Sequence, residues 1–103
     1  MKVYRSKAFT GSQAWEAQPI TQFGDTTVKL HWTDRPYKWH INDGQEVFAV
    51  MDGCVEMQYK ENGEIKSKNL HVGDIFYASE GTEHIACPQG EARILVIEKQ
   101  GSV

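Results

Sequence analysis

The sequence predicts an all-β fold closed into a barrel or a sandwich, and three observations support this prediction. Several short segments alternate apolar and polar residues with a period of two, as strands with one buried face do. Turn signals separate these segments, and Asn62-Gly63 is the strongest, because both central residues of a type I′ turn need a positive φ. No segment of helix length shows a 3.6-residue period. Many short strands joined by regular turns are typical of barrels, and closure removes exposed strand edges.

The expected strands are residues 27–33, 46–51, 54–60, 65–70, 75–79, 84–87 and 93–98. In the first of them Val28, Leu30 and Trp32 share one face, and Lys29 and His31 share the other. Residues 1–25 are mixed in composition, and we expect them to form an N-terminal arm with short strands. The barrel is expected over residues 26–100, and a chain of 103 residues fits a single domain overall.

Composition narrows the range of partners. The net charge is −3 and no basic run occurs, which argues against nucleic acid or an anionic membrane as a partner. No stretch reaches the roughly 18 apolar residues of a membrane span, and no apolar segment of a signal peptide follows the first residues. Two cysteines, Cys54 and Cys87, are too few for a disulfide framework. We therefore expect a cytoplasmic protein whose partner is a small-molecule ligand or substrate.

One short segment carries side chains of the metal-binding type. His40 and Asn42 lie two residues apart, so an extended chain points both to the same side. Asp43-Gly44 then turns the chain, and Glu46 begins the next strand. Asn42 has two readings from the residues alone: a neutral amide ligand beside His40, or a turn residue whose side chain bonds to the nearby backbone.

A second segment supplies another histidine. Gly81 permits a tight turn before the strand that carries His84. In order and separation, the two segments resemble the two sequence motifs of the cupin superfamily, and the resemblance covers about residues 28–98. The first motif, G-x5-H-x-H-x3–4-E-x6-G, here reads His40-x-Asn42-x3-Glu46-x6-Gly53. The second motif, G-x5-P-x-G-x2-H-x3-N, here reads Gly73-x5-Ser79-x-Gly81-x2-His84-x3-Pro88.

The chain departs from the family motifs at four positions, which are Asp34, Asn42, Ser79 and Pro88 in place of Gly, His, Pro and Asn. The resemblance implies a cupin double-stranded β-helix, a jelly-roll barrel of about eight strands. It also implies that His40, Glu46 and His84 are metal ligands, with Asn42 as a fourth. Two imidazoles and a carboxylate suit one divalent metal ion, Fe, Mn, Zn or Ni, and leave positions open for water or substrate.

Three functions agree with this site. The first is a metalloenzyme that acts on a small polar molecule as a dioxygenase, isomerase or decarboxylase, in which the metal polarises the substrate or binds O₂. The second is a non-catalytic cupin that binds a small ligand or a metal. The third is a metal-free structural member, which the loss of a histidine at Asn42 would explain. Gln58, Tyr77 and Glu83 are candidates for an acid or base beside the metal, whereas His31 and His71 are expected to be structural or exposed.

A homodimer is also expected. The N-terminal arm contains Val3, Tyr4, Phe9 and Trp15, which is more apolar surface than a free tail carries. The resemblance to small cupins implies pairing through such an arm.

Overall fold

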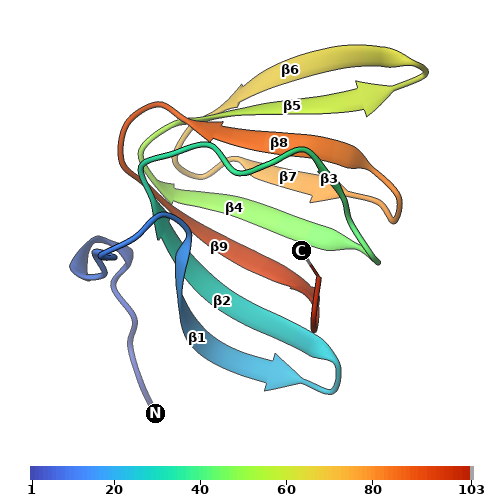
Figure 1. Ribbon diagram of the computed structural model, residues 1–103. Coiled ribbons are helices and arrows are strands. Elements are labelled where there is room, and N and C mark those ends of the chain that lie inside the picture. The colour runs from blue at the N-terminus through green and yellow to red at the C-terminus, as the bar shows by residue number, and fades with distance from the viewer. Residues whose placement is uncertain (103) are drawn as a thin grey trace.

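The computed structural model of the protein describes residues 1–102 and confirms the all-β prediction (Figure 1). Two antiparallel sheets have the strand orders β1-β2-β9-β4-β7 and β3-β8-β5-β6. The strands are β1 (Glu16–Phe23), β2 (Thr26–Thr33), β3 (His40–Ile41), β4 (Glu46–Asp52), β5 (Val55–Glu61), β6 (Glu64–Leu70), β7 (Ile75–Ala78), β8 (Glu83–Pro88) and β9 (Ala92–Lys99). A single 3-10 turn, η1 (Ser6–Ala8), precedes them, and the described residues contain no helix long and apolar enough to cross a membrane.

Residues with positive φ shape two of the turns. Asn62 and Gly63 have φ values of 54° and 78°, as the type I′ prediction for the β5–β6 turn requires. Gly53, the glycine that ends the first motif, has a φ of 83°, and a Cβ atom there would lie 2.4 Å from the Glu91 carbonyl oxygen. Only glycine therefore lets the end of β4 pass this close to the chain that enters β9.

The N-terminal arm, residues 1–25, contains one strand of eight residues, β1. Strand β1 pairs with β2 along its whole length, with an irregularity between Pro19 and Thr21. The residues before β1 are held by the buried Arg93 guanidinium, which donates hydrogen bonds to the Phe9 carbonyl (2.8 Å) and to Thr10 Oγ1 (3.0 Å). The first strand of the five-stranded sheet is thus supplied by residues that the sequence assigned to the arm.

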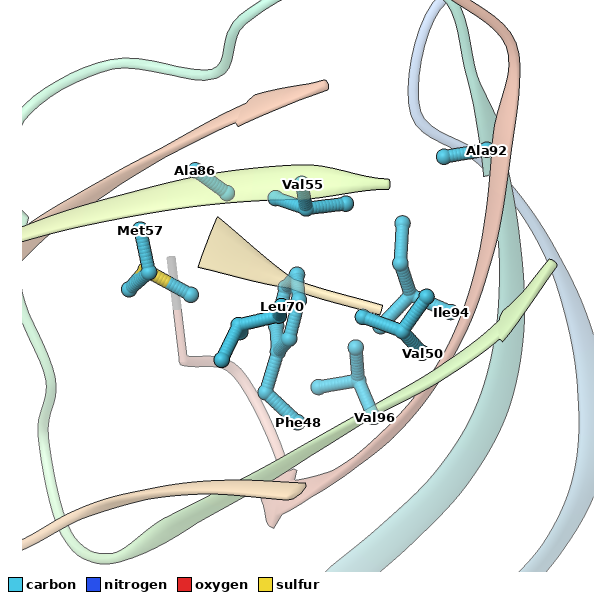
Figure 2. Packing of buried hydrophobic residues seen from close by; sticks show 9 residues of the cluster. All are labelled: Phe48, Val50, Val55, Met57, Leu70, Ala86, Ala92, Ile94 and Val96. Atoms are coloured by element: carbon cyan, nitrogen blue, oxygen red, sulfur yellow. The ribbon is translucent and has the colours of Figure 1, made fainter. Parts of the chain in front are cut away.

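A core of apolar side chains lies between the two sheets (Figure 2). It consists of Phe48, Val50, Val55, Met57, Leu70, Ala86, Ala92, Ile94 and Val96. Val55, Met57 and Ile94 are fully buried. These residues fill one part of the barrel interior and leave the other part to polar side chains.

The register of the large sheet decides which residues face that interior. Directly opposed residues of neighbouring antiparallel strands point to the same face. Lys29 on β2 is opposite Val96 on β9, which is opposite Phe48 on β4. Because Phe48 and Val96 belong to the core, Lys29 lies on the inner face of the sheet.

The apolar side of β2 is accordingly its outer side. Leu30 and Trp32 are both buried, although they face away from the barrel interior. The N-terminal segment covers this side, and a Cβ atom on Gly11 would lie 2.8 Å from Cε3 of Trp32. The alternation in the sequence grouped these residues correctly, but the apolar group lies outside the barrel core, where the N-terminal segment lies against Trp32.

Candidate metal centre

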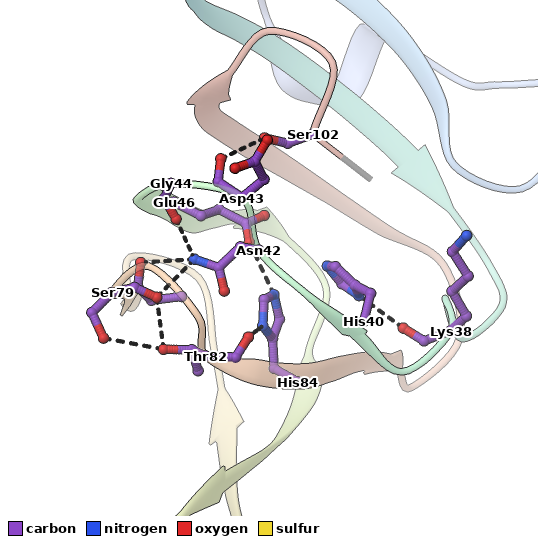
Figure 3. A network of polar contacts seen from close by, with 11 residues as sticks. Lys38, His40, Asn42, Asp43, Gly44, Glu46, Ser79, Thr82, His84 and Ser102 are labelled. Carbon is purple, nitrogen blue, oxygen red and sulfur yellow. Dashed lines mark hydrogen bonds and ion pairs between the residues drawn. The ribbon is translucent and has the colours of Figure 1, made fainter.

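Three of the residues that the motifs single out meet inside the barrel (Figure 3). His40 comes from β3, Glu46 begins β4 and His84 lies on β8. One ligand atom from each can be chosen so that all three lie within 4.8 Å of one another. The two histidines are directly opposed in the β3–β8 pair, and their ring centroids are 4.3 Å apart. Residues separated by up to 44 positions in the chain thus form one group that could hold a metal ion.

Backbone carbonyls orient both imidazole rings. Nδ1 of His40 lies 2.9 Å from the Lys38 carbonyl oxygen, and Nδ1 of His84 lies 3.0 Å from the Thr82 carbonyl oxygen. A carbonyl oxygen only accepts, so each Nδ1 carries the proton and donates it. Nε2 of each ring is then the nitrogen available to a metal, and this use of the other ring nitrogen is typical of metal-ligating histidines.

Glu46 and His84 form a buried pair. Oε1 of Glu46 accepts a hydrogen bond from Nε2 of His84 at 2.9 Å, and both side chains are almost completely shielded from solvent. Burial acts to lower the pKa of His84, but the hydrogen bonds to Glu46 and to the Thr82 carbonyl, with the Glu46 charge, outweigh it and raise the pKa. A metal ion bound at Nε2 of His84 would replace the proton that this nitrogen donates to Glu46, so metal binding would release a proton.

His40 is the more accessible of the two histidines. Burial lowers the pKa of its imidazole, and the charge of His84 acts in the same direction against the hydrogen bond to Lys38. The ring is therefore neutral at pH 7, with a lone pair on Nε2. A neutral ring is the form that binds a metal ion.

Asn42 is buried next to this group, and its amide nitrogen is used elsewhere. Nδ2 donates to the carbonyl oxygens of Gly44 (2.6 Å), Ser79 (2.8 Å) and Ala78 (3.2 Å). Three acceptors around one atom identify that atom as the amide nitrogen, because carbonyl oxygens cannot donate. The hydrogen bond to Gly44 is the kind expected of a turn residue whose side chain bonds to the nearby backbone. The hydrogen bonds to Ala78 and Ser79 connect the β3–β4 turn to the end of β7. Oδ1 of Asn42 is buried without a hydrogen-bond partner among residues 1–102.

The three clustered residues open into a cavity of about 160 Å³. Aromatic and aliphatic side chains form much of its wall, among them Trp15, Tyr37, Phe48 and Val96. Trp15 and Tyr37 meet edge to face, with their ring centroids 5.3 Å apart. Trp15 stands just before β1, so the N-terminal segment supplies part of the wall.

Four polar residues of the cavity wall were not among the sequence-based candidates: Lys29, His31, Glu98 and Ser102. Nδ1 of His31 lies 3.3 Å from the Trp15 carbonyl oxygen, and burial lowers the pKa of the ring. Burial, together with the Glu46 charge, raises the pKa of Glu98 to about 7. Strand alternation did contain a signal, because Glu98 shares a face with Ile94 and Val96.

The acid or base candidates named from the sequence lie elsewhere. Tyr77 is exposed and donates a hydrogen bond to Gln45 at 2.8 Å. Glu83 forms an ion pair with Lys60 at 2.8 Å. Gln58 does not line the cavity either, because it alternates with the inward-facing Met57 and Tyr59 on β5. Alternation along β5 and β8 turns Gln58 and Glu83 away from the metal group.

Comparison with known proteins supports the fold. No protein-family model and no curated protein matches the chain. A solved cupin-2 domain protein from Shewanella frigidimarina is similar, with a TM-score of 0.77, 26% identity and coverage of 91% of this chain and 87% of that one. A cupin superfamily protein from Desulfitobacterium hafniense has a TM-score of 0.78 at 10% identity, covering 92% and 86% of the two chains.

An enzyme is also among the similar structures. The iron(II) form of HppE, a hydroxypropylphosphonic acid epoxidase, in complex with substrate has a TM-score of 0.70 and 17% identity. The alignment covers 82% of this chain and 53% of that one. The protein described here therefore has the cupin fold, and its barrel contains a His-Glu-His group suited to a divalent metal.

Proposed function

We propose that the protein is a metalloenzyme that holds one divalent cation with Nε2 of His40, the carboxylate of Glu46 and Nε2 of His84. The observation that carries this proposal is the convergence of these three groups on one cavity, with both Nδ1 atoms already tied to carbonyls. The alternative of a metal-free structural barrel gives no reason to bury a histidine and a carboxylate where apolar residues would pack at lower cost.

The donor set fits a first-row divalent cation. Two imidazoles and one carboxylate with open positions suit Fe(II), and Mn(II), Zn(II) and Ni(II) also accept them. The likeness to the iron(II) form of HppE favours iron. When bound, such a cation polarises a substrate oxygen or supplies one-electron chemistry.

The residues of the chain divide the remaining tasks. The carbonyls of Lys38 and Thr82 keep the imidazoles in place. The apolar wall excludes water from the reacting molecule. His31 and Glu98 line the same cavity, and Glu98, whose pKa is raised to about 7, can hold or release a proton near neutral pH as general acid-base catalysis requires.

Metal analysis of the untagged protein, followed by thermal unfolding with added Fe²⁺, Mn²⁺, Ni²⁺ or Zn²⁺, tests the proposal. We expect one metal per chain and, at one hundred times Kd, a stabilisation of about 2.7 kcal/mol. His84→Ala should abolish this response, whereas His71→Ala should retain it, because His71 is exposed and does not belong to the His40-Glu46-His84 group.

Loss of the buried pair could unfold the His84→Ala variant, so His40→Ala provides a second test. His40 is half-buried and, among the residues that the structure describes, forms no hydrogen bond or ion pair with a carboxylate. If both variants respond to metal as the parent does, the site assignment is wrong.

A further inference from the structure

Lys29 is a cation in the cavity that contains the His40-Glu46-His84 group, and within the described part of the chain it has no partner. It is half-buried on β2, points to the inner face and lines the cavity. Among residues 1–102 no hydrogen bond or ion pair of its ammonium group is found, although Glu98 lines the same cavity. Partial burial of an unpaired ammonium group costs free energy, and an anionic partner would offset that cost.

The net charge of the cavity with a cation bound also favours an anionic ligand. With a divalent cation at the His-Glu-His group, the Glu46 carboxylate cancels only one of its two charges. Lys29 adds another positive charge, and among residues 1–102 Glu98 is the one further carboxylate side chain of the wall. With the cation bound, the cavity therefore carries a net positive charge whether or not Glu98 is ionised, and an anion that enters it reduces that charge.

The size and walls of the cavity limit what that anion is. A cavity of about 160 Å³ is close to the roughly 150 Å³ cavity that accepts benzene in another protein, and below the roughly 300–1,000 Å³ of drug-sized sites. Phe48, Val96 and Trp15 offer apolar contacts to the rest of the molecule. A small organic acid with a short apolar body satisfies both conditions.

Resting on the metal site proposed above, we infer that Lys29 makes the cavity selective for a small organic acid. The acid's carboxylate or phosphonate group lies between the Lys29 ammonium and the cation, and its apolar part lies against the aromatic wall. Lys29 is thus a specificity-determining residue of the site. An uncharged molecule of the same shape gains the apolar contacts only.

Calorimetric titration of the Zn²⁺-loaded protein with butyrate, propylphosphonate and the uncharged butyramide tests this inference. We expect the better of the two acids to bind at least tenfold more tightly than the amide, which is about 1.4 kcal/mol. The comparison of butyrate with propylphosphonate shows which oxyanion the site prefers. Lys29→Met keeps the length of the side chain and should lose the preference, and Lys29→Arg should keep most of it. Lys68→Met, at an exposed position on β6, is the matched control and should behave as the parent.

The outcomes separate this inference from the metal site. If the parent prefers butyramide, or if Lys29→Met prefers acids as strongly as the parent, Lys29 has no role in selectivity. Zn²⁺ affinity is measured in parallel and should be within about threefold of the parent in Lys29→Met. If the parent binds no metal, the proposed function fails, and the same acid titrations on the metal-free parent and Lys29→Met then decide the role of Lys29 on their own.

Discussion

Replacement of Asn42 tests whether this residue positions the two motif segments or binds the metal. In the structure the two hydrogens of its Nδ2 are shared among three carbonyl oxygens within hydrogen-bond distance, and the residue is 3% exposed. With a net contribution of roughly 0.5–1.5 kcal/mol for each hydrogen bond, Asn42→Ala should cost about 2–4 kcal/mol. An unfolding entropy of about 2.1 cal/mol/K per residue converts this cost into a fall in Tm of about 10–20 °C.

Two further variants sharpen the test. Asn42→Asp places a carboxylate among three carbonyl oxygens, so it should destabilise more than Asn42→Ala at pH 7. Protonation would restore a donor, and the excess cost should shrink as the pH falls towards 4. Asn42→His should lose the same hydrogen bonds and leave the Ni²⁺ affinity unchanged. Asn69→Ala, at an exposed position on β6, should stay within about 0.5 kcal/mol of the parent.

Urea unfolding with a chelator present, followed by tryptophan fluorescence, measures the stabilities, and calorimetry measures the Ni²⁺ affinities. A cost below 1 kcal/mol for Asn42→Ala would refute the positioning role. A tenfold gain in Ni²⁺ affinity for Asn42→His would also contradict the positioning role, because it would show that the side chain at position 42 faces the metal.

Three other predictions follow from the structure. Gly53→Ala should destabilise the protein by about 2–5 kcal/mol, because strain at positive φ adds to a clash with the Glu91 carbonyl. Gly63→Ala, at a position that also has a positive φ but open space around it, should cost about 1–2 kcal/mol. Equal costs of the two variants in urea unfolding would contradict the clash at Gly53. The pKa of Glu98 is raised from 4.5 to about 7, so its contribution to stability is present below pH 4.5 and is lost as the pH rises to about 7. Between pH 5 and pH 8 the free energy of unfolding of Glu98→Gln should therefore rise by about 1 kcal/mol relative to that of the metal-free parent, a figure reduced for solvent screening. A difference in stability that does not change with pH would contradict the raised pKa. If the protein is the expected homodimer, deletion of the exposed residues 1–5 should convert dimers to monomers, as measured by sedimentation. A parent protein that is already monomeric at high concentration would contradict the homodimer.

The fold class could be predicted from the sequence because it depends on local rules, and the grouping of His40, Glu46 and His84 could be predicted from the resemblance to two motifs. A period of two identifies strands, and Asn62-Gly63 specifies a type I′ turn through the backbone freedom of its residues. His40, Glu46 and His84 were found because they stand at the spacing of two motifs. The resemblance to the cupin superfamily, which connects the two segments, is confirmed by the solved structures. The assignment of Asn42 to the metal stays a prediction.

The tertiary structure decided what local patterns leave open. Alternation on β2 separates Lys29 and His31 from Leu30 and Trp32, but it cannot say which group faces inward. The N-terminal segment settles this by covering the apolar group from outside, so that the charged group lines the cavity. The contact between the N-terminal segment and Trp32 joins segments that are distant in the chain. Burial of apolar surface stabilises it, and the alternation of residues along a strand does not show which segment will cover that surface.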